Sequence, residues 1–175
     1  MKITFTGPES SGKSTISKSV ADYFDAQWFA EHARTYLLEL GREYDFGDIE
    51  KIALEQDELR TNQESKGLKI YDTENIVLYI WSNFKYKKCA ENVKSLMENQ
   101  HFTHYFLCSP AGIPWEEDPL RESPNHREEL FELYLEELRN QNVNFTILEG
   151  DFEERRDRAI ELIEDISLSK GGYCV

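Results

Sequence analysis

The chain has 175 residues, of which 39% are hydrophobic and 31% are charged, and this composition is typical of a globular domain with a sizeable core. Its formal net charge of −14 at pH 7 gives an acidic surface that repels the phosphate backbone of DNA or a long RNA. We therefore expect no nucleic-acid partner. We also expect the positive charge that is present to gather where a small phosphorylated ligand binds.

Neither a membrane span nor a secretory leader is indicated by the sequence. No run approaches about 18 apolar residues, and the first apolar strand begins at residue 2. The three cysteines (Cys89, Cys108 and Cys174) are few and unpatterned, which argues against a disulfide framework and against a zinc site. These features favour a cytoplasmic protein with no membrane partner.

Short apolar segments alternate with helical segments along the whole chain, as in a parallel sheet flanked by helices. The sequence predicts strands at 2–6, 27–30, 68–72, 103–108 and 144–148. It predicts helices at 13–24, 31–40, 48–65, 74–83, 86–99, 126–140 and 152–167. The fold class is therefore α/β, and we expect residues 1–175 to form a single domain.

The segment Gly7–Ser14 follows the first predicted strand and leads into a helix that begins near Lys13. Its sequence, GPESSGKS, has the spacing of a phosphate-binding P-loop, or Walker A motif. In such a loop the backbone N–H groups and the helix N-terminus face the phosphates, the lysine reaches the β- and γ-phosphates, and the serine can ligate Mg²⁺. The residues expected to contact ATP are Gly7, Glu9, Ser10, Ser11, Gly12, Lys13, Ser14 and Thr15.

Glu31 and Arg34 follow the second predicted strand, three residues apart at the start of a helix. This spacing directs both side chains the same way. The carboxylate can accept hydrogen bonds from sugar hydroxyls, and the guanidinium can guide a phosphate or a carboxylate. From the spacing alone, an ordinary ion pair on a solvated face is an equally good interpretation.

Asp72 ends the third predicted strand, at the edge of the sheet where open parallel sheets bind ligands. It could hold Mg²⁺ through water, as a Walker B acid does, or accept a proton from an acceptor hydroxyl. The alternative is a helix N-cap, because a helix is predicted directly after it.

The segment 109–124 holds four of the five prolines and lies between a strand and a helix. Irregular loops of this length are usually functional or disordered, and we interpret residues 110–125 as a lid. Arg121 and Arg127 could close over the transferred phosphoryl group, although an isolated arginine is more often a surface residue. Near the start of the last helix, Arg155 could stack on adenine or reach its phosphates, or simply lie on a solvated face.

The sequence resembles the NadR-type P-loop kinase domain in motifs that occur in the same order: Gly7–Ser14, Glu31-x-x-Arg34, Asp72–Glu74, and Trp115-x-x-Asp118-x-x-Arg121 with Arg127 behind it. The kinase domain of that family phosphorylates nicotinamide riboside with ATP. The resemblance therefore implies a three-layer P-loop NTPase fold with a five-stranded sheet of order 2-3-1-4-5 and a lid. It also implies ATP and Mg²⁺ as cofactors and nicotinamide riboside, or a similar nucleoside, as the acceptor.

Roles for individual residues follow from the resemblance and from the motifs together. The residues expected to be catalytic are Lys13, Asp72, Arg121 and Arg127, with Ser14 and Asp72 at the metal. Those expected to bind the acceptor are Glu31, Arg34, Trp81 and Trp115, the tryptophans by stacking on its ring. The alternatives are a kinase for another nucleoside or a nucleotide, and a nucleotide-binding regulatory switch that hydrolyses ATP slowly.

Overall fold

The computed structural model describes residues 1–61 and 67–169 of the chain. Within them lies a five-stranded parallel sheet of order β2-β3-β1-β4-β5. The strands are β1 (Lys2–Thr6), β2 (Gln27–Phe29), β3 (Lys69–Asp72), β4 (His104–Cys108) and β5 (Phe145–Leu148). The predicted α/β class and strand order are confirmed.

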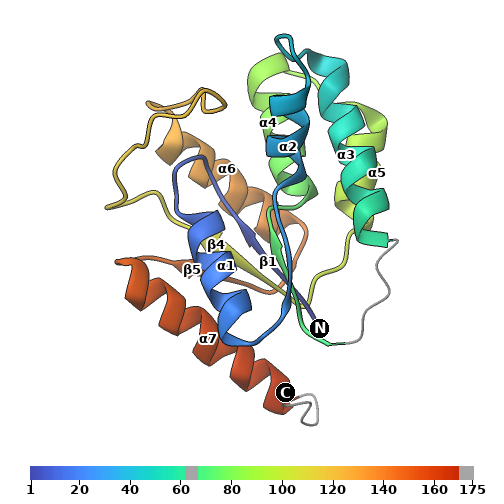
Figure 1. Cartoon of the computed structure of the whole chain (residues 1–175). Coiled ribbons are helices and arrows are strands. Elements are labelled where there is room, and N and C mark those ends of the chain that lie inside the picture. Colours follow the sequence, from blue (N-terminus) through green and yellow to red (C-terminus); the bar gives the residue numbers. More distant parts are fainter. Residues whose placement is uncertain (62–66, 170–175) are drawn as a thin grey trace.

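Helices cover both faces of this sheet (Figure 1). They are α1 (Lys13–Tyr23), α2 (His32–Glu39), α3 (Phe46–Thr61), α4 (Asn75–Tyr86), α5 (Glu91–Asn99), α6 (Arg127–Asn140) and α7 (Phe152–Ser169). On one face α1 and α7 pack against each other and against β1, β3 and β4 through a core that includes Ile3, Phe5 and Phe106. The other face is covered by the α4–α6 region, and α2 and α3 extend this layer.

Because side chains alternate along β1, this strand contributes residues to both faces of the sheet. Ile3 and Phe5 enter the core beneath α1, while the hydroxyls of Thr4 and Thr6 point to the other side and bond to residues that follow β3. Every residue of β1 after Lys2 is fully buried, as expected of a central parallel strand.

Three predicted helix boundaries were wrong. The helix predicted at 74–83 continues to Tyr86 as α4, and it ends at Lys87, whose backbone is left-handed (φ 54°) and whose N–H bonds to the Asn83 carbonyl. The helix predicted from residue 86 therefore begins only at Glu91. The predicted 48–65 helix begins at Phe46, and its last four positions, 62–65, lie outside the described residues.

All five strands are parallel, so their carboxyl ends meet at one edge of the sheet. The P-loop follows β1 at this edge, α2 follows β2, and Asp72 ends β3. Residues 109–126, which contain neither helix nor strand, follow β4 and return over this edge to α6 (Figure 1). No helix in the described part of the chain is long and apolar enough to cross a membrane.

Candidate active site

The backbone of the P-loop approaches β4 so closely that only glycine fits at position 7. Gly7 has φ 128°, and a Cβ there would lie 2.7 Å from the Cys108 carbonyl oxygen. Gly12, with φ 81°, is the N-cap of α1. The Lys13 ammonium donates to the Pro8 carbonyl at 2.7 Å, so the lysine side chain folds back over the loop. The loop thus has the turn that the sequence motif predicts.

A cavity of about 400 Å³ extends from the P-loop to α2, α4, α6 and the lid segment. One end is formed by residues 7–15. The part formed by α2, α4, α6 and the lid is mainly apolar and aromatic, with Leu37, Val77, Ile80, Trp81, Phe84, Leu120, Leu130 and Tyr134 among its lining residues; Lys85, Glu116, Glu122, Ser123 and His126 line it as well. Glu31, Arg34 and Arg121 also line the cavity. A compartment of this size with a few converging charges is typical of a small-molecule site.

Electrostatic interactions show how closely the charged side chains gather around Glu31. Burial and the charge of Asp72 raise the pKa of Glu31, while the charges of Lys13, Arg34 and Arg121 oppose the rise. The sequence singled out all five of these residues, which come from the P-loop, the turn after β2, the start of α2, the end of β3 and the lid; all but Asp72 are among the residues that line the cavity.

Asp72 is only 2% exposed, and its carboxylate faces the start of α1. Burial raises its pKa, against the opposing effects of a hydrogen bond from the Ser14 hydroxyl and the charge of Lys13. Its Oδ1 atom accepts no hydrogen bond from any described residue. Asp72 does not cap α4, as the alternative interpretation had it. The N-cap is Glu74, whose carboxylate accepts from the Ile76 N–H at 2.6 Å.

The oxygen atoms of Ser14 and Asp72 fit a Mg²⁺ site. Magnesium prefers oxygen ligands and is usually bound by one or two protein groups together with phosphate oxygens and water. A buried carboxylate oxygen without a partner, beside a serine hydroxyl, provides such a group. No cluster of three or more His, Cys, Asp or Glu side chains suited to a metal occurs within 1–61 and 67–169, so phosphates would complete the coordination here.

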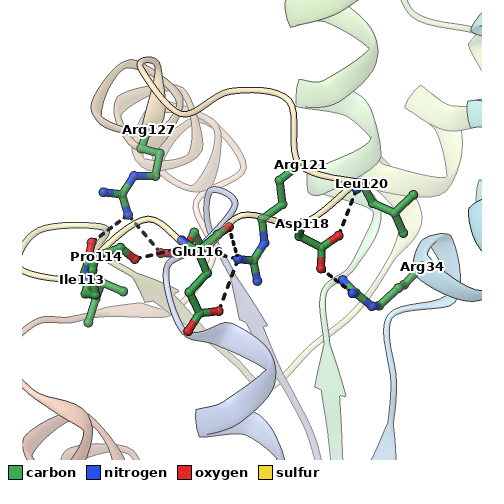
Figure 2. A network of polar contacts seen from close by, with 9 residues as sticks. Arg34, Ile113, Pro114, Glu116, Asp118, Leu120, Arg121 and Arg127 are labelled. Atoms are coloured by element: carbon green, nitrogen blue, oxygen red, sulfur yellow. Dashed lines mark hydrogen bonds and ion pairs between the residues drawn. The ribbon is translucent and has the colours of Figure 1, made fainter.

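Figure 2 shows how the lid segment rests on the P-loop. The Arg121 guanidinium donates to the Glu116 carbonyl at 2.7 Å, and it also lies 3.3 Å from the Glu116 carboxylate and 3.4 Å from Ser10 Oγ. The Arg127 guanidinium donates to the carbonyls of Ser10 (3.0 Å) and Ile113 (2.9 Å). Arg121 thus lines the cavity directly, whereas Arg127 ties the lid to the P-loop backbone.

Two further contacts attach the lid to the helices. Asp118 forms an ion pair with Arg34 at the start of α2 (Figure 2). Glu122 accepts from the Tyr44 hydroxyl at 2.6 Å and from the Lys85 ammonium at 2.9 Å.

The lid is also bound to the P-loop through Glu9, whose carboxylate accepts hydrogen bonds from the backbone N–H groups of Glu122 and Ser123, both at 3.0 Å. The lid therefore bridges the P-loop, α2 and α4.

Sequence reasoning missed the roles of Tyr44, Lys85 and Glu122. Each is an unremarkable polar residue in a charged sequence, and nothing in its local pattern differs from a solvated surface. The Glu122 contacts join residues 78 and 37 positions apart, so only the folded chain brings them together.

Two tryptophans had been expected at the acceptor, and the structure places them differently. Trp81 lines the apolar end of the cavity and donates its indole N–H to the Tyr44 hydroxyl at 3.0 Å. Trp115 lies outside the set of cavity-lining residues, next to the Arg127 guanidinium, which is 5.9 Å from its ring. Stacking on an acceptor ring is therefore favoured for Trp81 over Trp115.

Arg155 is fully buried beneath the loops rather than open to the cavity. Its guanidinium donates to four carbonyls, those of Gly150 (2.7 Å), Ser109 (2.8 Å), Ser11 (3.1 Å) and Ala111 (3.1 Å). These contacts favour a structural role over the expected contact with adenine, because most of its donors are already satisfied by the protein backbone.

A parallel sheet of order 2-3-1-4-5, a P-loop after its central strand and an arginine-bearing lid after β4 define a P-loop protein of kinase-like fold. Residues 2–155 match the family model described as an AAA domain, and the chain belongs to this family of P-loop proteins. The chain is also 26% identical over 178 residues to the trifunctional NAD biosynthesis/regulator protein NadR of Salmonella typhimurium, which confirms the resemblance to NadR-type proteins.

The matched region covers 97% of this chain and 43% of that NadR protein, so the chain spans less than half the length of its curated relative. Among solved structures, a NadR protein in complex with NR superposes with a TM-score of 0.79 at 18% identity, over 94% of this chain and 51% of the other. A deoxyadenosine kinase from M. mycoides superposes with a TM-score of 0.57 at 18% identity, over 97% of this chain and all of the other. These structures share the fold.

Proposed function

We propose that the protein is an ATP-dependent small-molecule kinase that phosphorylates the ribosyl 5′-hydroxyl of nicotinamide riboside or a similar nucleoside. The observation that carries this proposal is the continuous cavity, which joins a P-loop to an apolar and aromatic compartment with Glu31 among its lining residues. A P-loop alone accommodates a phosphate donor. A separate apolar compartment next to it accommodates a ring, as a kinase acceptor site must.

The donor would lie on the P-loop. The loop N–H groups and the α1 N-terminus would hold the phosphates, and the Lys13 ammonium would exchange the Pro8 carbonyl for a phosphate oxygen. Ser14 and Asp72 would hold Mg²⁺, which, when bound, neutralises charge on the β- and γ-phosphates. The lid would cover this arrangement and exclude water from it.

In the transfer itself, the acceptor hydroxyl oxygen bonds to the γ-phosphorus and the bond from that phosphorus to the β–γ bridging oxygen breaks. The hydroxyl proton goes to a carboxylate, and Asp72 is the candidate because burial raises its pKa and so makes it a better base. Its two proposed roles, proton acceptor and metal ligand, are compatible with one position. Arg121 would stabilise the charge that develops on the transferred group.

The charges around the cavity favour a neutral hydroxyl over a phosphate as the acceptor group. A nucleotide acceptor needs an available cation for its phosphate, but Arg34 is paired with Asp118 and Lys85 with Glu122. Glu31 instead presents a carboxylate, which accepts hydrogen bonds from ribose hydroxyls and repels phosphate. This arrangement supports a nucleoside kinase more than a nucleotide kinase.

The relatives give the proposal its particular substrate. A solved NadR structure of the same fold contains NR, and the curated NadR relative acts in NAD biosynthesis by its name. We propose the same substrate and the same metabolic role for this chain, with ATP as donor and a cytoplasmic location.

An acceptor screen tests the proposal. Purified protein with ATP and Mg²⁺ is incubated with a panel of nucleosides and nucleoside monophosphates, and ADP release and the phosphorylated product are both measured. We expect phosphorylation of nicotinamide riboside or another nucleoside, and none of the monophosphates. Slow ADP release without any phosphorylated product from any acceptor would support the regulatory-switch alternative instead.

A further inference from the structure

Thr73, the residue after Asp72, has a left-handed backbone with φ 72°. For a β-branched residue this conformation is a genuine outlier, and it persists only where surrounding contacts impose it. Thr73 is 2% exposed and lies between the strand that ends at Asp72 and the cap of α4. The contacts that hold the Thr73 backbone therefore lie directly next to Asp72 in the chain.

Three hydrogen bonds hold the Thr73 backbone. Its N–H donates to the Phe5 carbonyl of β1 at 3.0 Å, and its carbonyl accepts from Thr4 Oγ1 at 3.4 Å. The shortest bond comes from the Arg60 guanidinium, which donates to the same carbonyl at 2.8 Å. Arg60 belongs to the last turn of α3, so this bond is made by a helix that otherwise lies away from the P-loop.

The position of Arg60 is itself fixed by its surroundings. Its guanidinium lies 5.3 Å from the centre of the Tyr71 ring. Burial lowers the pKa of Arg60 to about 10, and the charge of the buried Glu74 opposes this effect. Glu74 is held in turn by Thr6 Oγ1 at 2.7 Å and by the Gln100 side-chain amide at 2.5 Å. Arg60 is thus a half-buried member of a polar network on the side of the sheet opposite α1.

We propose that Arg60 is a positioning residue of the active site: by holding the Thr73 carbonyl, it keeps the left-handed turn in place and directs the Asp72 carboxylate toward Ser14. Arg60 donates to the Thr73 carbonyl and packs on the Tyr71 ring, so its effect would reach the site through the position of Asp72 rather than through a contact with substrate. The inference rests on the proposed function, in which Asp72 serves the transferred phosphoryl group.

The variant that tests this is Arg60→Met, which removes the donors but keeps most of the side-chain volume. The control is Val93→Ala in α5, which truncates a fully buried side chain between α3 and α5 without touching Asp72 or its neighbours. A misplaced catalytic group typically lowers turnover by about 10- to 100-fold, and we expect this loss in kcat for Arg60→Met at saturating ATP and Mg²⁺. The control Val93→Ala should keep the parental kcat even when its melting temperature falls as much as that of Arg60→Met.

A double-mutant cycle separates positioning from general destabilisation. If Arg60 acts through Asp72, adding Arg60→Met to Asp72→Asn changes kcat by less than about 2-fold, because the group that Arg60 positions is already gone. Val93→Ala should have the same effect in both backgrounds. Equal losses from Arg60→Met with and without Asp72 would overturn the proposal, as would a normal kcat in Arg60→Met alone.

A second measurement does not depend on finding the acceptor. Calorimetry gives the affinity for ATP with Mg²⁺ and with EDTA, and we expect Arg60→Met to reduce the gain in affinity from Mg²⁺ while the affinity in EDTA is unchanged. The proposal would be overturned if Mg²⁺ increased the ATP affinity of Arg60→Met as much as it increases that of the parent. A parent that phosphorylates no acceptor would contradict the proposed kinase function, and the calorimetric result would still decide the role of Arg60.

Discussion

Arg34 and Asp118 lie 84 residues apart in the sequence, and their side chains form an ion pair that joins the start of α2 to the lid. The hydrogen bond to Asp118 raises the pKa of Arg34, and the charge of Glu31 adds to this effect. The lid is therefore connected to the helix that would hold the acceptor, as well as to the P-loop. Under the proposed function, we expect binding of an acceptor at Glu31 and closure of the lid to be coupled through this pair.

The first prediction concerns that coupling. Asp118→Asn keeps the shape of the side chain but removes its charge, so the lid should be held less firmly on α2. We expect the KM for the acceptor to rise by about 10-fold, the scale of one charge-assisted contact, with ATP affinity unchanged. Steady-state kinetics with each substrate varied in turn measures this. Asp22→Asn, which removes the exposed ion pair with Lys18 on α1, is the matched control and should behave as the parent.

Lys13→Ala tests the P-loop. No other cation belongs to the loop, so removing this ammonium should weaken Mg·ATP binding by about 10-fold or more, the scale of a charge-assisted contact, and should abolish turnover. Isothermal titration calorimetry measures the first effect and ADP release the second. Lys18→Ala, one turn further along α1, provides the control. Unchanged binding and turnover in Lys13→Ala would contradict the assignment of the loop.

Asp72→Asn tests the buried carboxylate. Because Glu74 rather than Asp72 caps α4, this change should leave the melting temperature nearly unchanged. Turnover should fall by at least about 100-fold, the usual scale for a positioned acid–base group. A lower melting temperature with normal turnover would mean that Asp72 serves the fold and not the reaction.

Arg121→Ala tests the lid. The guanidinium lines the cavity and touches Ser10 of the P-loop, so its charge can reach a transferred phosphoryl group. We expect a loss in kcat of about 100-fold with little change in ATP affinity, the signature of an interaction made mainly in the transition state. Single-turnover kinetics at saturating ATP measures it. Arg158→Ala, an exposed residue of α7, is the control, and a normal kcat in Arg121→Ala would remove this arginine from the mechanism.

His104 gives a prediction for stability against pH, away from the site. Burial lowers the pKa of His104 to about 4, whereas an unfolded histidine titrates near 6.5. Between these values the unfolded chain binds more protons, so stability from this group is complete above pH 6.5 and is lost as the pH falls toward 4. The loss is at most about 3 kcal/mol. Urea unfolding at pH 7.5 and at pH 5 measures this loss. In His104→Gln, the free energy of unfolding should differ less between the two pH values than it does in the parent.

The sheet and the donor half of the site could be predicted from the sequence because each is encoded locally. Strand alternation, the Gly7–Ser14 spacing and an acid at the end of β3 all lie within short segments. The α4–α5 boundary was misplaced because Lys87, not a glycine, takes the left-handed position that ends α4. Propensity alone gives no sign of that exception.

The lid contacts and the network around Thr73 could not be predicted for a different reason. Arg60 reaches the Thr73 carbonyl from 13 positions away, and Glu122 reaches Tyr44 from 78. Such partners are chosen by the packing of whole helices. A local pattern shows only that a charged residue is present, and the same pattern fits a solvated surface.

The four carbonyls held by Arg155 belong to the P-loop, to the stretch that opens the lid, and to the turn before α7. Through Arg155, α7 thus holds the P-loop and the lid in their relative positions, although α7 itself does not line the cavity. A lid transferred from a relative would need an arginine at position 155 to bind the carbonyls of its first residues, as Arg155 binds those of Ser109 and Ala111 here. A chain cut after β5 would lose α7 and, with it, the guanidinium that holds the Ser11 carbonyl of the P-loop, although every P-loop residue proposed to contact ATP would still be present.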